Sequence, residues 1–216
     1  MNTFPGAPKV AKGGIVLVDA RSGKMLALIS LQYNPLTLKR TYEVQRYGDG
    51  KGPTRLKGPA IETLNIEADI DATDQLEFPE QHENAVTHGI QPQLAALEAL
   101  INPSSEQLNK NNRLASSGTL ELAPMEAPMA LFVWSKNRIV PVRITSFSIT
   151  EESFDTQLNP IQATVTLGMQ VLSVTDLGFN HKGGSLFMNY LQNKEQLASK
   201  ATGASLADFG INSLPV

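Results

Sequence analysis

Three acidic residues, Asp69, Asp71 and Asp74, have a spacing that could bind a metal ion. Carboxylates gathered in this way attract hard cations such as Ca²⁺. The run lacks the central glycine and the closing glutamate of a calcium loop, and Asp69 falls on the polar side of an alternating segment. We therefore interpret these residues as the solvated end of a strand and predict no metal site.

A lysine lies among glycines in the segment Gly48-Asp-Gly50-Lys-Gly52. A phosphate-binding loop requires the pattern G-x-x-x-x-G-K-[ST] between a strand and a helix. Pro53 follows the last glycine, and no helical pattern begins there. A loop within residues 47–58 is the better interpretation, and we predict no bound cofactor.

The remaining reactive side chains are not spaced for catalysis. The three histidines, His82, His88 and His181, are scattered and lack the H-E-x-x-H spacing of a metalloprotease. The chain has no G-x-S-x-G elbow, and Glu151 and Glu152 are sequence neighbours, so they cannot be read as an acid–base pair. It also has no cysteine, which excludes thiolate metal sites and cysteine nucleophiles. We predict that the protein is not an enzyme.

The composition excludes further classes of function. The 216 residues include 18 basic and 21 acidic side chains, a balance of −3 that is unlike that of a nucleic-acid-binding protein. The longest apolar runs, residues 15–18 and 25–31, are far shorter than the roughly 20 residues that span a bilayer. The start of the chain has no apolar segment of a secretory signal. We therefore expect no direct membrane insertion, and folding in a cytoplasm.

Strands dominate the pattern along the chain. Residues 63–70 alternate between apolar and polar side chains, which is the period of a half-buried strand. Similar apolar or alternating runs predict strands at residues 15–18, 25–31, 38–46, 129–134, 139–149 and 163–174. Because loops rather than repeated helices join them, we predict a mainly β fold, an antiparallel barrel or sandwich.

Two helices accompany these strands. Leu94, Leu97 and Ile101 share one face of a predicted helix at residues 92–101, and a second helix is predicted at residues 186–200, with Leu197 on its apolar side. Residues 71–93 and 103–117 are expected to be polar loops, and residues 206–209 a weak helical turn. We divide the chain into a flexible arm (1–14), a β domain (15–176) and a C-terminal helical extension (177–216).

Three stretches, in their order and spacing, resemble a known family. They are LISLQYNP at residues 28–35 followed by residues 38–40, GPAIETLNIEADIDA at residues 58–72, and residues 128–134 leading through 140–154 to 158–165. Together they resemble the N-terminal domain of contractile injection system tube-initiator, or baseplate hub, proteins, which belong to phage-tail-like particles. The resemblance covers about residues 14–176.

The resemblance implies a fold like that of the tube protein, with a helix on its flank. It implies six copies in a hexameric ring that joins the spike (VgrG-like) protein to the inner tube proteins and initiates tube assembly. Baseplate wedge or sheath-initiator proteins would be further partners. Assembly would take place in a bacterial cytoplasm, and the finished particle would be either released or membrane-anchored.

Many relatives carry a C-terminal LysM domain, for which the roughly 40 residues after the last predicted strand are too few. Three explanations stay open. The helix at residues 186–200 replaces that domain as a peripheral contact, the chain is a minimal version, or it forms a second tube-like ring rather than the spike adaptor.

The stretches that carry the resemblance give the predicted assembly contacts. These are the turn residues Tyr33, Asn34 and Pro35, together with Glu151, Asn159 and Pro160 in an expected loop at residues 151–160. Both Asn-Pro pairs also suit plain turn formation. Phe154, within the same loop, is expected to pack in the core.

Contacts between stacked rings are expected at the glycine-rich loop, residues 47–58, with Gly50 and Gly52, and at the polar loop, residues 71–93. Strands with one apolar face and one uncharged polar face would line a channel without trapping charged cargo.

Two other classes of function remain as alternatives. A stand-alone β-sandwich module that binds a carbohydrate or peptide would need an aromatic patch, but aromatic residues make up 6% of the chain and do not cluster. An enzyme with a site at a barrel mouth would need convergent titratable groups, and the sequence shows none.

Overall fold

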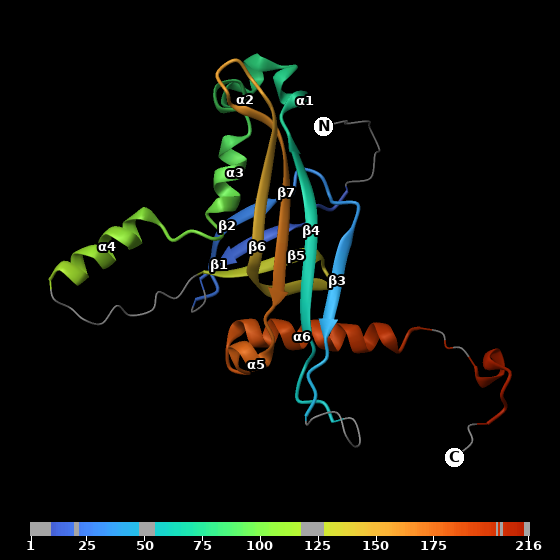
Figure 1. Cartoon of the computed structure of the whole chain (residues 1–216). Coiled ribbons are helices and arrows are strands. Elements are labelled where there is room, and N and C mark those ends of the chain that lie inside the picture. Colours follow the sequence, from blue (N-terminus) through green and yellow to red (C-terminus); the bar gives the residue numbers. More distant parts are fainter. Residues whose placement is uncertain are drawn as a thin grey trace.

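Seven antiparallel strands form one sheet in the order β2–β1–β5–β6–β7–β4–β3 (Figure 1). The computed structural model describes residues 10–19, 22–47, 55–117, 128–201, 203 and 205–213. The strands are β1 (Gly14–Val18), β2 (Met25–Ser30), β3 (Leu38–Glu43), β4 (Ile61–Asp71), β5 (Met129–Ser135), β6 (Arg138–Phe154) and β7 (Pro160–Val171). The helices are α1 (Thr73–Leu76), η1 (Pro79–Gln81), α2 (Glu83–His88), α3 (Gln91–Glu98), α4 (Ser105–Ser116), α5 (Val174–Leu177), α6 (Lys182–Ala198) and η2 (Leu206–Phe209).

The long strand β6 divides the sheet into two layers. Its first part, up to Val142, pairs with β5, and the remainder pairs with β7. The register shifts between Ile144 and Ser146, and a shift of this kind bends a strand. Gly168 lies opposite this shift, and a Cβ added there would lie 2.2 Å from the Ser146 Oγ, so that the Ser146 side chain packs directly over the glycine. Strands β1, β2 and β5 therefore cross the upright layer of β6, β7, β4 and β3 (Figure 1).

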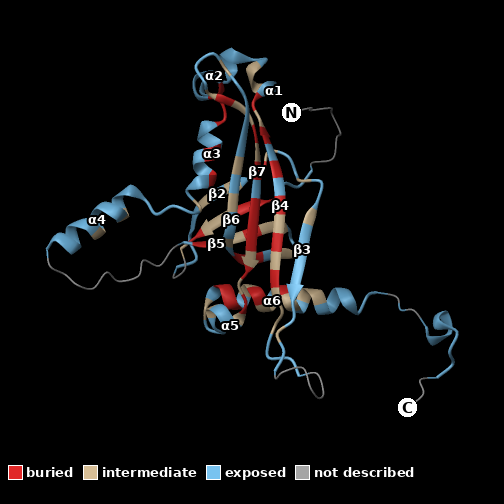
Figure 2. Cartoon of the chain, in the orientation of Figure 1, coloured by how far each residue is buried: buried red, intermediate tan, exposed pale blue. Residues whose placement is uncertain are grey.

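The core lies between these two layers and under helix α3 (Figure 2). Phe132 of β5 and Val140 in the first part of β6 contribute to it from one layer, and Leu167 and Met169 of β7 contribute from the other. All four side chains are fully buried. Helix α3 adds Leu94 and Leu97. The apolar sides of alternating strands thus face one another, which is what stabilises a two-layer β fold.

The prediction of a mainly β, antiparallel fold is confirmed, with each of the seven predicted strands present. The sheet does not close into a barrel, because its first and last strands, β2 and β3, are not paired with each other in the described part of the chain. The bend in β6 brings the two layers face to face without joining their outer strands. The predicted helix at residues 92–101 is α3, and the predicted turn at residues 206–209 is η2.

Two of the expected loops are helical. The segment at residues 71–93 contains α1, η1, α2 and the start of α3. The segment at residues 103–117 contains α4, which begins at a capping box: the Ser104 Oγ accepts from the Gln107 amide at 3.2 Å, and the Gln107 side chain accepts from the Ser104 amide. This S-x-x-Q pattern is a sequence signal for a helix start. None of the residues of α4 is buried.

The region after β7 also differs from the prediction. Helix α6 begins at Lys182, and its buried aromatic residues are Phe187 and Tyr190, whereas Leu197 is 52% exposed. The side chain of Phe154 was expected in the core but is half exposed, because it lies at the end of β6. In the described part of the chain no helix has the length and apolarity needed to cross a membrane.

Candidate assembly surface

The upright layer, β6–β7–β4–β3, presents a polar face on the side away from the core. Register sets this face, because Asn65, Thr166 and Ser148 occupy alternate positions to the buried Leu64, Ile66, Val165 and Leu167. Uncharged polar side chains on this face are Thr63, Asn65, Ser148, Thr150, Thr164, Thr166 and Gln170. Charged side chains lie among them, because Lys39 pairs with Asn65, Glu67 with Thr166 and Asp69 with Thr164. The face is therefore polar, with charges of both signs.

Both lateral edges of this layer are open. Within the described residues, strand β3 pairs with β4 alone, and the part of β6 beyond Val142 pairs with β7 alone. Open edges carry unpaired backbone donors and acceptors, which other strands can use. The chain of antiparallel pairs also makes β3 run opposite to β6. A rotated copy of the layer could therefore continue the sheet with an antiparallel joint.

A third open edge, β2, is markedly apolar. The side chains of Met25, Leu26 and Leu28 are all more than half exposed, and β2 pairs with β1 alone in the described residues. A hydrophobic edge strand left uncovered is prone to association.

The predicted contact residues Tyr33, Asn34 and Pro35 form a turn after β2. The Asn34 side chain accepts from the Gly13 amide at 2.9 Å and donates to the Ala11 carbonyl at 2.8 Å. Asn34 therefore has a structural role, since it holds the segment that leads into β1. Tyr33 is 46% exposed and available for contact.

The turn at Tyr33 is linked to the upper end of the upright layer. The neighbouring Gln32 side chain exchanges two hydrogen bonds with the backbone of Asp71, at 2.6 and 3.0 Å, and the Asp71 carboxylate accepts from Gln162 at 2.8 Å. Burial alone would raise the pKa of Asp71, but its hydrogen bonds from Thr73 and Gln162 outweigh burial and lower it. The two predicted contact stretches therefore lie at one end of the sheet.

The second stretch, at residues 151–160, is half strand and half connecting loop. Glu151 belongs to β6 and Pro160 begins β7, so that only residues 155–159 connect the two strands. Asn159 donates to the Asp155 carboxylate at 2.8 Å and to the Thr87 carbonyl at 3.2 Å. The hydrogen bond from the Asn159 side chain, and then those from the Asn159 and Gln157 amides, lower the pKa of Asp155. Asn159 thus fixes the hairpin against α2. Gly50 and Gly52 lie outside the described residues.

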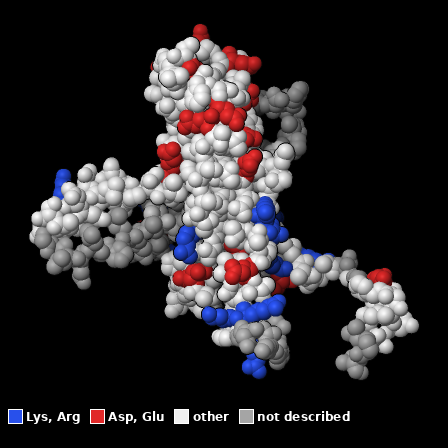
Figure 3. All heavy atoms as spheres, in the orientation of Figure 1, with Lys and Arg blue, Asp and Glu red and all other residues white. Residues whose placement is uncertain are grey.

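Charge is distributed unevenly along the upright layer (Figure 3). The end formed by α1, α2 and the β6–β7 hairpin carries acidic residues, and residues 67–90 and 148–162 contain no lysine or arginine. Their acidic side chains are Glu67, Asp69, Asp71, Asp74, Glu77, Glu80, Glu83, Glu151, Glu152 and Asp155. Arg46 and Leu56 form a bridge in the segment that follows β3, near Arg55 and Lys57, and at this opposite end basic and acidic side chains are mixed.

The Asp69–Asp74 run belongs to the acidic end. Asp69 accepts from the Thr164 hydroxyl at 3.1 Å, and Asp71 has the partners described above. Among the described residues, no group of three or more acidic or histidine side chains is arranged to hold a metal ion. His181 accepts from the Gly183 amide at 3.0 Å and so caps the start of α6.

A buried carboxylate, Glu62, joins helix α6 to the edge of the sheet. Glu62 is 3% exposed and accepts hydrogen bonds from the Tyr42 hydroxyl at 2.8 Å, the Tyr190 hydroxyl at 3.0 Å and the Lys194 ammonium group at 2.9 Å. The guanidinium group of Arg40 lies 3.9 Å away. Both carboxylate oxygens thus accept hydrogen bonds, which makes burial of the charge tolerable.

The sequence pattern contained a signal for this cluster. Glu62 has the same parity in β4 as Leu64 and Ile66, so an alternating strand points its carboxylate toward the core. Burial alone would lower the pKa of Lys194, but Tyr190, Glu62 and Tyr42 outweigh it and raise that pKa. Burial and then the hydrogen bond to Glu62 raise the pKa of Tyr42. The partners of Glu62 belong to α6 and β3. No pattern within the sequence around Glu62 indicates that these two elements lie beside β4.

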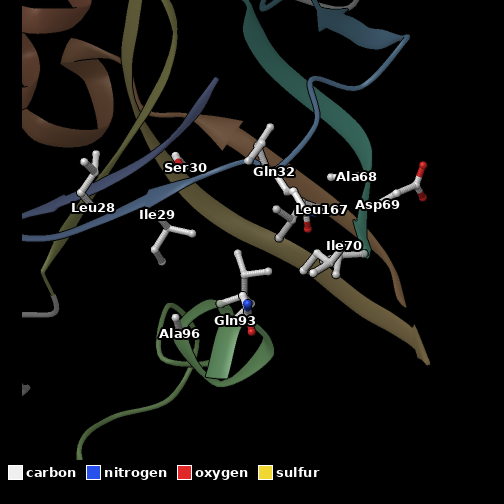
Figure 4. A pocket seen from close by; sticks show the side chains of 13 residues that line it. Leu28, Ile29, Ser30, Gln32, Ala68, Asp69, Ile70, Gln93, Ala96 and Leu167 are labelled. Atoms are coloured by element: carbon white, nitrogen blue, oxygen red, sulfur yellow. The ribbon is translucent and has the colours of Figure 1, made fainter. Parts of the chain in front are cut away.

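An apolar pocket of about 270 Å³ lies between β2, β4 and α3 (Figure 4). Leu28, Ile29 and Ile70 line it, with Ala96 of α3 on the other side. Asp69 is the one titratable side chain among its lining residues, and it is bonded to Thr164. The pocket therefore offers apolar contact rather than acid–base chemistry.

No protein-family model matches the chain, and no curated protein matches it in sequence. Two solved structures are similar at a low level. One is a chain from the tail of an empty gene transfer agent particle with C6 symmetry, with 13% identity, a TM-score of 0.29, and coverage of 74% of this chain and 90% of that chain. The other, from the virion of a native gene transfer agent particle, has 11% identity, a TM-score of 0.27 and the same coverages. Similarity of this size identifies neither a family nor a function.

Proposed function

We propose that the protein is a structural component of a contractile injection system baseplate, where six copies form a ring that joins the spike to the inner tube and initiates tube assembly. The observation that carries this proposal is the upright layer with two open edges that run in opposite directions. The sequence resemblance supplies the class of particle, the sixfold number and the partners.

The layer is suited to head-to-tail closure. When a copy is rotated about an axis parallel to its strands, its β6 edge comes beside the β3 edge of the next copy, and the joint is antiparallel. Contacts of this kind close into rings when the rotation divides a full turn. Six copies of four strands spaced about 4.8 Å apart would enclose a circle about 37 Å across, before strand tilt widens it. The polar face, with Lys39, Glu67 and Asp69 on it, would then line the lumen.

The two ends of the layer are suited to stacking. The acidic end holds the helices of the predicted contact segment at residues 71–93, and the opposite end holds Arg46 together with Arg55 and Lys57 of the predicted contact segment at residues 47–58. Rings stacked in one direction would bring opposite charges together, which favours association and selects orientation. The spike, the tube proteins and the wedge or sheath-initiator proteins would meet these two faces.

The alternative of a stand-alone ligand-binding module has one observation in its favour, the apolar pocket beside the open edge of β2. Such a module would stay monomeric at concentrations where a ring protein assembles. The same experiment therefore tests both functions.

The test compares two lysine substitutions on the polar face by sedimentation velocity and negative-stain microscopy. Thr150→Lys places a charge on the open edge of β6, where lysine opposes strand pairing between chains. Thr166→Lys places it in the middle of the same face, on β7. We expect rings from the unmodified chain and from Thr166→Lys, and their loss in Thr150→Lys. A monomer at all concentrations for the unmodified chain would contradict the proposal.

A further inference from the structure

Helix α6 extends beyond the edge of the sheet that it covers (Figure 1). It begins beneath the β5 side, where Gly183 lies so close to Leu177 and Met129 that a Cβ would fall 2.5 and 2.8 Å from them. It reaches the opposite edge at Lys194, which bonds Glu62 and the Tyr42 hydroxyl of β3. A helix of 17 residues is about 25 Å long, whereas four strands span about 14 Å. Residues after Lys194 therefore lie beyond β3.

The segment beyond β3, which we call the tail (described residues 195–201, 203 and 205–213), displays uncovered apolar side chains. Leu197 is 52% exposed, and Phe209 of η2 is 71% exposed. Leu206 and Ile211 are also exposed, at 39% and 38%. A single helical turn cannot bury these side chains on itself. Asp208 bonds the Ser205 amide at 2.6 Å and so orders the turn that displays Phe209.

An open cavity of about 550 Å³ lies between β5, β6 and α5, at the other lateral side of the same end of the molecule. Ala130, Val142, Ile144 and Leu177 give it apolar walls, and Arg143, Asp176 and His181 give it polar ones. The Arg143 guanidinium lies 4.0 Å from Asp176, a loose pair whose cation is 59% exposed. Residues 205–213 have one charged side chain, Asp208, which is opposite in sign to Arg143 and of the same sign as Asp176.

We propose that the tail of one copy inserts Phe209 into this cavity on the next copy and so clasps neighbouring subunits together. The occupant is a second copy of this chain, because tail and cavity lie on opposite sides of the layer. The tail extends beyond the β3 edge, and the cavity lies beside β6 at the same end of the molecule. The rotation that joins these two edges brings tail and cavity together. The clasp rests on the proposed ring, and it adds a contact made by side chains to the backbone pairing of the edges.

The first test uses engineered cysteines, since the natural chain has none. Phe209→Cys is combined with Leu177→Cys in the cavity, and the control pair combines Phe209→Cys with Leu28→Cys, which is exposed on β2. Mild oxidation and non-reducing electrophoresis should give a ladder of linked chains for the first pair and none for the control. Equal ladders, no ladder, or a disulfide within single chains would overturn the clasp.

The second test separates the clasp from the ring. Phe209→Ser should raise the concentration at which half of the chains are in rings by about tenfold, while Leu36→Ser, at a fully exposed position away from the tail, should leave it unchanged. Rings that form equally well with Phe209→Ser would overturn the clasp and leave the proposed function standing. Absence of rings from the unmodified chain would overturn both.

Discussion

The Lys194 ammonium group lies 2.9 Å from the Glu62 carboxylate, which joins residues 132 positions apart in the chain. Glu62 belongs to the second strand from the edge, and Lys194 belongs to the helix that crosses beneath it. Tyr42 on the edge strand and Tyr190 on the helix complete the contact. The pair therefore sets where α6 crosses the sheet and which of its residues lie beyond the edge.

Removal of Lys194 should destabilise the protein through this contact. Lys194→Ala leaves the Glu62 carboxylate buried with two hydroxyl donors and a distant guanidinium group. Loss of one partner of a buried pair costs about 3–5 kcal/mol, and the one-third exposure of Lys194 reduces this to about 1–3 kcal/mol. Urea unfolding measures the change. Glu195→Ala, one residue further along α6 and exposed, should stay within about 0.5 kcal/mol.

High pH should weaken the same contact. The pKa values of Lys194 and Tyr42 are raised in the folded protein, so the folded state keeps protons that the unfolded state has lost. This contribution is complete below about pH 10, the unfolded value of both groups, and is lost as pH rises through the folded pKa values. The free energy of unfolding should therefore fall above about pH 10.

The double variant Tyr42→Phe with Lys194→Met provides the control for this pH dependence. It removes both titrating groups, so its stability should decline less steeply over the same range of pH, as measured by urea unfolding at each pH. An equal decline in both proteins would assign the alkaline loss to other residues.

Alanine substitutions at two glycines with positive φ angles should distinguish the cost of backbone strain from the cost of a steric clash. Gly89 and Gly178 have φ angles of +57° and +81°. A Cβ at Gly89 would lie 2.1 Å from the Pro160 carbonyl oxygen, whereas a Cβ at Gly178 would meet nothing within 4 Å. Both alanine variants pay about 1–3 kcal/mol of strain, and Gly89→Ala must also displace the hairpin. Thermal unfolding should show a clearly larger loss for Gly89→Ala.

The strands could be predicted from the sequence because their signal is local. Alternation in residues 63–70 and the apolar run at 129–134 identify strands wherever they pair. The bend of β6 could not be predicted in this way, since it depends on Ser146 fitting against Gly168 of another strand. The sequence therefore left a barrel and a sandwich as alternatives for strands whose edges could not be assigned.

The candidate contacts show the same difference between local signals and long-range placement. The asparagines at positions 34 and 159 were found as turn residues, and the structure gives both of them partners within the chain. The sequence predicts the helical turn at residues 206–209 but not the exposure of Phe209. That exposure depends on the position of the turn beyond the edge of the sheet. Long-range placement, rather than residue type, decides which apolar side chains remain available for assembly.

Substitution by alanine should affect the stability of the protein strongly at Phe132 and weakly at Phe154. Phe132 is fully buried and stacks on Trp134 with 5.8 Å between ring centroids, so Phe132→Ala should cost about 3–5 kcal/mol. Phe154 is half exposed at the acidic end, so Phe154→Ala should cost less than about 1 kcal/mol of stability. If the hairpin end meets a stacked ring, Phe154→Ala should instead shorten stacks seen by negative-stain microscopy. Unchanged stacks, at unchanged stability, would remove this end from the contact surface.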